Sequence, residues 1–353
     1  MQPEQNRLAI IFLGALVLIA VGMVLKFAQG VVLPLIIAWL LSFLIGPAIN
    51  YMTQRKIPTT LAVVFVLIIL LGILYLSGTF LYARIEAFAR EYPKYQTRFM
   101  ELAAVLTSRF DLSFDPLAGI NWGQNIGRFL YTLSGSIFNF VSKLILVVVF
   151  LFFLLLGKPY FKYKIGKSFS EDDATQLSNI TNSVTGQIRR YLSFQFLISF
   201  ATGLCVWFSL LLIGVDFPVT WGALAFFLNF IPTIGSIVAS IPPILLAIVQ
   251  FYPELIPAAI TAVAVVSIQM VIGNGIAPKV LGDQLNLSPV VVLLSLLFWG
   301  WLWGIAGALM SVPIAASIKI ICENIPVLHP ISVMMGSGVS YWREAKKRQK
   351  VEE

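Results

Sequence analysis

The sequence has little charge and almost none of the residues that usually carry out catalysis. Only 11% of its 353 residues are charged, it has two cysteines, and its single histidine is His329, outside the apolar segments. A Ser/His/Asp triad or a histidine-based metal site inside a membrane is therefore excluded, and two distant cysteines predict neither a disulfide framework nor a metal cluster. The sequence also lacks a Gly-x-x-x-x-Gly-Lys loop, which excludes ATP-driven transport by this chain alone. We expect no enzyme activity, no metal and no cofactor.

Apolar residues, in contrast, are abundant and arranged in long runs. Hydrophobic residues make up 59% of the chain and the mean hydropathy is +0.90, far outside the range of soluble domains. Runs of about 18 to 25 apolar residues suit helices that cross a bilayer. The sequence predicts an all-α, polytopic integral membrane protein with about eight transmembrane helices, some of them broken in the C-terminal half. The net charge of +8 comes from basic residues in loops and at the C-terminus, so we expect the lipid bilayer and no nucleic acid as a partner.

The hydropathy pattern divides the chain into six regions. They are three membrane helices in 1–83, an extramembrane amphipathic helical region in 84–135, a fourth membrane helix in 136–157, a cytoplasmic connecting helix in 158–190, a C-terminal membrane core in 191–325 and a basic cytoplasmic tail in 326–353. Within the first region, the apolar runs Leu8 to Leu25 and Val31 to Ile49 predict a tight helical hairpin. The bias of Lys and Arg predicts that both termini are cytoplasmic.

Two extramembrane stretches carry helix signals. Ser170, followed by Glu171, Asp172 and Asp173, predicts a helix N-cap with acidic residues in the first turn. In the 84–135 region, apolar residues at helical spacing predict an amphipathic helix that packs on the protein's own membrane domain; binding a partner or gating is the alternative. These residues are Phe99, Leu102, Leu106 and Phe110.

Glycine and proline interrupt the apolar segments between Asn229 and Pro313. Deep in a bilayer, an interrupted helix has to lie against protein or line a wet cavity, and such interruptions often mark the substrate site of a transporter. The segments 219–251 and 289–322 are too long for one straight crossing and either cross or re-enter. We expect breaks at Pro232, Gly235 and Pro242-Pro243 in the first and near Pro313 in the second. The stretch from Trp221 to Pro232 and that from Trp303 to Pro313 are only weakly alike, so we expect no true internal repeat.

Amide and hydroxyl side chains beside these interruptions form the candidate substrate site. Such groups can replace the hydrogen bonds that a small polar solute makes with water. Gln269 and Asn274 are five residues apart, so they share a face only if a neighbouring glycine unwinds the helix. The predicted substrate-binding residues are Asn229, Pro232, Thr233, Gly235, Gln269, Asn274 and Pro278.

Charged residues near these segments leave the mechanism open. Lys279 and Asp283, four residues apart, form either a gate or a simple structural ion pair. A cation antiporter usually needs a buried carboxylate, and the acidic residues here lie at segment ends, which favours a carrier of a neutral solute. The alternative from another class is a membrane scaffold or regulator whose kinks serve packing alone.

Motifs in the second half of the chain are specific in order and spacing. They include Tyr191-Leu192 with Gln195 and Gly203, Gly214 to Phe217, Ile231 to Gly235, Ala277 to Gly282, Leu287 to Pro289, and Gly304 with Gly307. This series resembles the autoinducer-2 exporter family of bacterial membrane permeases. The resemblance implies a multi-pass protein of the bacterial inner membrane that exports a quorum-sensing signal or another small polar solute, or exchanges sodium or lithium for protons. It also implies a homo-oligomer, with a pentamer as one such assembly.

Overall fold

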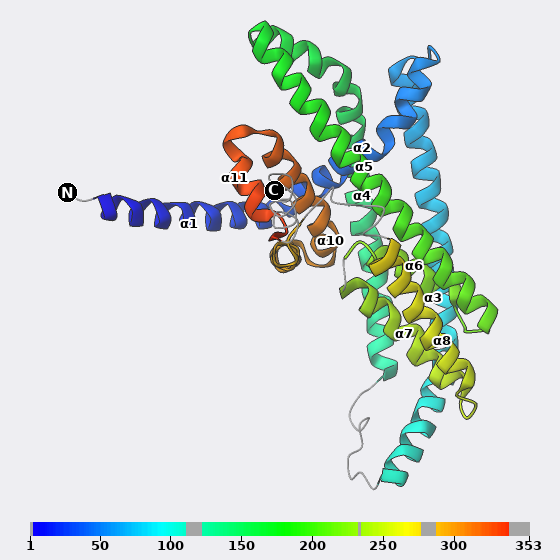
Figure 1. Cartoon of the computed structure of the whole chain (residues 1–353). Coiled ribbons are helices and arrows are strands. Elements are labelled where there is room, and N and C mark those ends of the chain that lie inside the picture. Colours follow the sequence, from blue (N-terminus) through cyan, green and yellow to red (C-terminus); the bar gives the residue numbers. More distant parts are fainter. Residues whose placement is uncertain (1–2, 111–121, 232–233, 277–286, 339–353) are drawn as a thin grey trace, which may run out of the picture. The chain divides into compact units, whose positions relative to one another are not determined.

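The computed structural model describes the backbone of residues 3–110, 122–231, 234–276 and 287–338, and the side chains of most of them. The elements in these ranges are helices (Figure 1), which confirms the predicted all-α membrane class. In chain order they are α1 (Pro3–Phe27), α2 (Gln29–Gln54), α3 (Thr59–Phe110), α4 (Trp122–Ser168), α5 (Glu171–Ile213), α6 (Pro218–Leu228), α7 (Ile234–Phe251), α8 (Ile256–Gln269), the π-helix η1 (Met270–Ile276), α10 (Pro289–Asn324), the 3-10 helix η3 (Pro326–Leu328) and α11 (His329–Met335).

Seven spans in the described part of the chain are long and apolar enough to cross a membrane. The sequence predicted about eight. The spans are Gln29–Gln54, Thr59–Thr79, Lys143–Phe161, Glu171–Ile213, Ile234–Phe251, Ile256–Gly273 and Pro289–Asn324. The helices α6 and α11 are apolar but shorter.

Three helices are much longer than a membrane is thick. The helices α3, α4 and α5 contain 52, 47 and 43 residues, which corresponds to about 65 to 80 Å against a hydrocarbon core of about 30 Å. The stretch 158–190, predicted to be a connecting helix, therefore consists of the end of α4 and the beginning of α5. At that junction the backbone N–H of Asp173 donates to Oγ of Ser170 over 3.3 Å, which confirms the predicted N-cap.

The chain folds into two compact units, which are described separately. The first comprises Met1–Val63, Val141–Ile188 and Leu287–Glu353. The second comprises Val64–Phe140 and Arg189–Asn286. Each unit contains one of the two segments that the sequence predicted to be too long for a single crossing.

In the second unit, α6 and α7 fold back on each other as a helical hairpin that packs against α8 (Figure 1). Gln250, at the end of α7, joins the two ends of this hairpin: its Nε2 donates to the carbonyl oxygen of Gly214 over 2.8 Å, and its Oε1 accepts from the N–H of Asp216 over 2.9 Å. The segment therefore returns to the end at which it began. The core of the unit contains Val206, Leu210, Ala225, Ala239, Leu246, Ala247, Ala258 and Val265.

The break in this hairpin lies between Leu228 and Ile234, as the glycine at 235 predicted. Gly235 is buried, and a Cβ placed there would overlap the carbonyl oxygen of Leu228, so only glycine permits this turn. The predicted break at Pro242-Pro243 is wrong, because both prolines lie inside the continuous helix α7. A proline keeps φ near the helical value and removes only one hydrogen bond at its position, which membrane helices tolerate.

In the first unit, α10 contains a second hairpin. Its turn is at Gly304, where φ is 64° and ψ is −142°, a conformation that favours glycine. The hydroxyl of Ser295 on the first arm donates to the carbonyl oxygen of Ser311 on the second arm. The predicted break near Pro313 is therefore wrong in position: Pro313 lies buried within the second arm.

The junction between α1 and α2 is a bend, and the predicted tight hairpin is wrong. The N–H of Ala28 donates to the carbonyl oxygen of Val24, and the N–H of Val32 donates to that of Ala28, so helical bonding continues through the junction. The C-terminal end of α1 instead packs on the tip of the α10 hairpin. There the indole Nε1 of Trp303 donates to the carbonyl oxygen of Leu25 over 3.2 Å.

The part of α3 that extends beyond its apolar span docks on the base of the α6–α7 hairpin. The hydroxyl of Tyr95 donates to the carboxylate of Asp216, and Arg98 donates to the carbonyl oxygen of Gln250 over 2.7 Å. Burial, together with the Asp216 carboxylate and Glu91, raises the pKa of the Tyr95 phenol well above its ordinary value. These contacts fit the prediction that the region packs on its own membrane domain, although the side chains that carried that prediction, Phe99 to Phe110, lie outside the described residues.

Candidate functional site

A line of polar side chains runs along one face of α5 and extends into its apolar C-terminal half. Tyr191, Gln195, Ser199 and Thr202 are spaced at i, i+4, i+8 and i+11, so the helix places them on the same side. Tyr191 and Gln195 are buried at 3% and 8% exposure, and Ser199 and Thr202 are fully buried. Because an unsatisfied polar group in hydrocarbon costs several kcal/mol, such a line needs partners or a function. We call these four residues the α5 polar seam.

Asn229 at the broken end of α6 pairs with the middle of the seam. The Nε2 of Gln195 donates to the backbone carbonyl oxygen of Asn229 over 3.0 Å, and the Nδ2 of Asn229 donates to Oγ of Ser199 over 3.1 Å. The last carbonyls of a helix lack intrahelical N–H partners, so an outside donor is needed where a helix ends inside the membrane. Gln195 supplies that donor, and the hairpin tip is thereby fixed to α5.

Two glycines allow α5 and α6 to approach closely enough for these bonds. A Cβ on Gly203 would lie 2.8 Å from the carbonyl oxygen of Gly222, and a Cβ on Gly222 would lie 2.7 Å from Cβ of Trp207. Small residues at a membrane helix crossing serve this close approach. The interruptions in the sequence and the glycines around them thus position one polar contact between α5 and the hairpin.

Three buried polar atoms of the second unit have no hydrogen-bond partner among the described residues. They are the hydroxyl of Tyr191 at the end of the seam, Nε2 of Gln269 at the end of α8, and Oγ1 of Thr220 on α6. Most buried polar atoms in proteins are paired, so each of these is a position where a ligand or an ordered water could supply the missing bond. Of the three, Gln269 belongs to the site predicted from sequence.

The helix changes its winding directly after Gln269. Residues Met270 to Ile276 form a π-helix, whose i to i+5 hydrogen bonding widens the turn. This winding brings backbone positions 269 and 274 toward the same side, which is the unwinding that the sequence required for the two amides to share a face. The side chain of Asn274 lies outside the described residues. Short π-helical turns occur frequently at functional sites.

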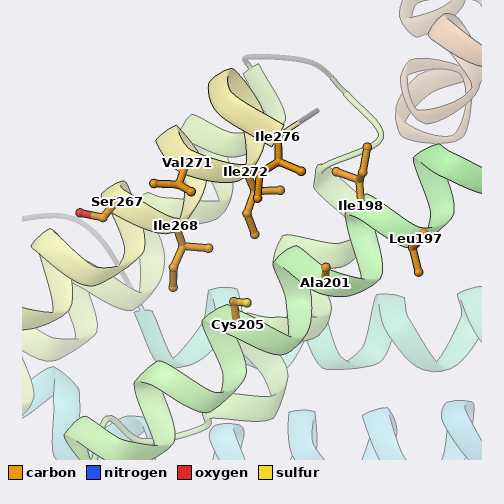
Figure 2. A pocket seen from close by; sticks show the side chains of 9 residues that line it. All are labelled: Leu197, Ile198, Ala201, Cys205, Ser267, Ile268, Val271, Ile272 and Ile276. Carbon is orange, nitrogen blue, oxygen red and sulfur yellow. The ribbon is translucent and has the colours of Figure 1, made fainter. Parts of the chain in front are cut away.

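A hollow of about 540 Å³ lies between α5 and the α8–η1 helix, one face away from the seam. Figure 2 shows Ile198, Ala201 and Cys205 of α5 facing Ile268 and Ile272 across it. Apart from Ser267, whose hydroxyl points away, the residues lining it carry apolar or thiol side chains (Figure 2). Of the predicted site residues whose side chains the structure describes, Asn229, Gly235 and Gln269 do not line this hollow.

The structure places Asn229 and Gly235 on either side of the turn that follows α6, whereas Gln269 lies at the end of α8. Asn229 contacts Gln195 and Ser199, Gly235 forms the turn beside it, and Gln269 is buried with an unpaired amide nitrogen. Pro232, Thr233, Pro278, Lys279 and Asp283 lie outside the described residues, so their predicted roles remain predictions. Ser199 was not predicted from the sequence, although its spacing of four residues from Gln195 and eight from Tyr191 indicated a shared helix face.

A buried lysine on the second arm of α10 was also missed. Lys319 is 4% exposed, and its Nζ lies 3.6 Å from Oε2 of Glu323, one helical turn further on and about half exposed. An ionisable residue buried in a membrane segment is expensive and usually functional. The signal was present, because Lys319 is the only charged residue between Pro289 and Cys322 in the sequence.

Comparison with known proteins supplies the family. The family model described as the AI-2E family transporter matches residues 13–326, which include both hairpins and the α5 polar seam. The chain belongs to this family. It is 34% identical over 323 residues to a putative transport protein of Borreliella burgdorferi, covering 92% of this chain and 89% of the relative. It is 32% identical over 335 residues to the AI-2 transport protein TqsA of Escherichia coli, covering 92% and 94%.

Another similar relative is a putative transport protein of Haemophilus influenzae, with 34% identity over 347 residues and coverage of 92% of this chain and 94% of the relative. AI-2E family proteins are membrane transporters, which agrees with the multi-pass helical fold and with the expectation that the chain is not an enzyme. Membership also supports a bacterial membrane location. The broken helices therefore belong to a transporter of the AI-2E family.

Proposed function

We propose that this AI-2E family transporter exports a small, neutral, polar solute along the α5 polar seam at the tip of the α6–α7 hairpin. The observation that carries the proposal is the pairing at a helix break of the half-buried Asn229 with Gln195 and Ser199, whose amide and hydroxyl groups are buried. Such groups donate and accept hydrogen bonds without carrying charge, which suits a polyol more than an ion.

In this proposal the seam opens and closes by exchanging hydrogen bonds. In the closed arrangement Asn229 satisfies Ser199 and Gln195, so the path holds no unpaired group at that point. When the hairpin tip moves away, the hydroxyls and amides of a solute take the place of Asn229. The unpaired hydroxyl of Tyr191 and amide of Gln269 provide further bonds along the path. Because the exchanged bonds are similar, the solute loses little on leaving water.

The first solute to test is AI-2, because the Escherichia coli relative is named as an AI-2 transport protein. A role in quorum sensing and a homo-oligomeric assembly in the inner membrane, with both termini cytoplasmic, belong to the same proposal. Function as a non-transporting scaffold or regulator is the opposing hypothesis, under which the hairpin tip serves packing alone.

The test is solute flux in proteoliposomes that contain the purified full chain. AI-2 and a panel of neutral polyols and monovalent cations should be compared for the wild type and for Asn229→Ala and Ser199→Ala. We expect each substitution to reduce flux about three- to tenfold, the value of one hydrogen bond. Thr261→Val is the matched control, since Thr261 is fully buried outside the seam and its hydroxyl donates to the carbonyl oxygen of Pro257 in its own helix. Equal, measurable flux in all four proteins would remove the seam from the path, and flux no greater than in empty liposomes would support the scaffold.

Sodium or lithium exchange for protons is a second candidate, favoured by one observation. Glu323 is a carboxylate beside the buried Lys319, and such a pair can couple the movement of a cation to that of a proton. Antiport predicts that a pH gradient drives sodium or lithium movement and that Glu323→Gln abolishes it. Flux of a neutral solute that is independent of both ions would support the first candidate.

A further inference from the structure

A second hollow, of about 240 Å³, lies in the first unit where three helices meet. It is formed by the last turns of α2, the first residue of α3 and the part of α4 near Pro159. The residues that line it are Gly46, Ile49, Asn50, Thr53, Thr59, Leu155, Lys158 and Pro159. They share no residue with the α5 polar seam, so a transport path there does not account for this hollow.

The hollow lies where three candidate membrane spans begin or end. The apolar span of α2 ends at Gln54, the span of α3 begins at Thr59, and that of α4 ends at Phe161. The ends of three spans therefore meet at one level, where hydrocarbon gives way to lipid headgroups. Arg55 and Lys56, in the turn between α2 and α3, are exposed beside it. The predicted orientation puts this level on the cytoplasmic side.

The lining combines a cation with a small apolar floor. Gly46 leaves room for the ammonium group of Lys158, because a Cβ on Gly46 would lie only 3.1 Å from its Nζ. Asn50 adds an exposed amide and Thr59 adds a hydroxyl, while the hydroxyl of Thr53 already donates to the carbonyl oxygen of Asn50 over 3.0 Å. Ile49 and Leu155 are buried at 5% and 3% exposure. Among the described residues, those lining the hollow include no acidic side chain.

A ligand that matches this lining has an anionic head with several acceptor oxygens and an apolar part beside it. A phosphate fulfils the first requirement, because Lys, amide and hydroxyl groups all donate to its oxygens. The second requirement, an apolar part beside the anionic head, is met by the acyl chains of a lipid, which would lie against Ile49 and Leu155 at the ends of the membrane spans. We propose that this hollow is a specific binding site for the phosphate of an anionic glycerophospholipid, held by Lys158 and Asn50.

This proposal differs from the general attraction of basic residues to anionic membranes. Exposed lysines further along α4, such as Lys164, attract anionic headgroups by charge alone, at about 1 kcal/mol each. In a specific binding site, the position of each side chain affects the affinity for the lipid, so Lys158 should contribute more to binding than Lys164, which has the same charge. That difference separates the two explanations.

The experiment measures lipid binding to the purified full chain in detergent by native mass spectrometry. Phosphatidylglycerol is titrated against the wild type, Lys158→Gln and the matched control Lys164→Gln, which removes the same charge from the same helix. We expect Lys158→Gln to weaken phosphatidylglycerol binding at least fivefold and Lys164→Gln to change it less than twofold. Phosphatidylcholine, which also has a phosphate but no net charge, should bind at least fivefold more weakly than phosphatidylglycerol to the wild type.

Two further arms keep the result decisive. If Lys158→Gln does not fold, Lys158→Arg and Asn50→Leu replace it. Lys158→Arg keeps the charge and should bind phosphatidylglycerol as the wild type does. Asn50→Leu removes the amide and should bind it more weakly. Glycerol 3-phosphate tests for a soluble ligand, and we expect no competition at concentrations equal to the lipid. Equal weakening by both glutamine variants, equal binding of the two lipids, or full competition by glycerol 3-phosphate would each overturn the proposal.

Discussion

Ser295 and Ser311 are sixteen residues apart in one apolar segment, yet the hydroxyl of the first donates to the carbonyl oxygen of the second over 2.8 Å. In a straight helix their separation would be about 24 Å. The bond therefore requires the chain to reverse at Gly304. A hairpin in this segment, together with the one formed by α6 and α7, means that neither long segment is one straight helix.

The reversal at Gly304 can be tested by cysteine cross-linking. Built on the backbone of Gly300, a Cβ lies 3.8 Å from Cβ of Ala308, within the range for a disulfide. We expect the double variant Gly300→Cys/Ala308→Cys, with Cys205 and Cys322 changed to serine, to form a disulfide on mild oxidation. Mass spectrometry of non-reduced peptides detects it.

The matched control for this cross-link places cysteines with the same spacing in a straight helix. Phe200 and Phe208 are exposed on α5 and are also eight residues apart, which corresponds to about 12 Å along the axis. The pair Phe200→Cys/Phe208→Cys should stay reduced. If neither pair forms a disulfide under conditions that oxidise nearby thiols, α10 is not folded back at Gly304.

The two hairpins have the same local feature, a glycine that allows close packing just after the turn. Each has a glycine just after the turn, Gly235 in one and Gly307 in the other, where a Cβ would overlap a carbonyl oxygen of the preceding arm. We expect Gly235→Ala and Gly307→Ala to destabilise the protein by about 1 to 3 kcal/mol or more, because the arms must separate. Thermal unfolding in detergent measures the loss. Gly186→Ala, on α5 with open space around it, should leave the melting temperature unchanged or raise it.

How far the sequence predicted the fold depends on the kind of signal. Long apolar runs predicted the membrane class, and the serine followed by acids predicted the cap at Ser170, because both depend on local composition. Prolines were poor guides to the breaks: Pro243 and Pro313 sit within helices, where their fixed φ is compatible with the helix. The turn at Gly304 depends on a positive φ. The segment contains several glycines, and the sequence does not indicate which of them adopts that conformation.

The candidate site was predicted in part for a similar reason. Asn229 and Gln269 were found because they stand beside interruptions, while Ser199 was missed because it lies mid-helix on α5. Its role follows from a contact between segments thirty residues apart, which the pattern of one segment does not contain. Lys319 was not predicted because it does not stand beside a glycine or proline, although it is charged and its segment is otherwise uncharged.

The bond between Tyr95 and Asp216 predicts a pH-dependent docking of the α3 extension on the hairpin base. Tyr95→Phe keeps the ring, which packs edge-on to Phe217 with centroids 6.3 Å apart, but removes the hydrogen bond to a carboxylate. We expect a loss of about 1.5 to 3 kcal/mol in stability. Tyr163→Phe, at an exposed tyrosine, is the control and should have no effect.

The sign of the pH effect follows from the raised pKa of Tyr95. The folded state holds the phenol proton more tightly than the unfolded state, so the stabilisation is complete below the ordinary tyrosine pKa of about 10 and declines as the pH rises above it. We expect the wild type to lose its advantage over Tyr95→Phe only in this alkaline range. An advantage that disappears between pH 6 and 8 would contradict the assignment to Tyr95.

Gln269 gives a prediction in which stability and transport change in opposite directions. Its Nε2 is buried without a partner among the described residues, at a cost of about 1 to 3 kcal/mol. Gln269→Leu removes that cost at similar volume, so the variant should unfold at the same or a higher temperature. If the amide binds solute, flux in proteoliposomes should nevertheless fall about three- to tenfold. Ser240→Ala, which removes a buried hydroxyl bonded within its own helix, should leave flux unchanged. Unchanged flux in Gln269→Leu would remove Gln269 from the path, because a residue kept only for packing has no reason to affect transport once the fold is intact.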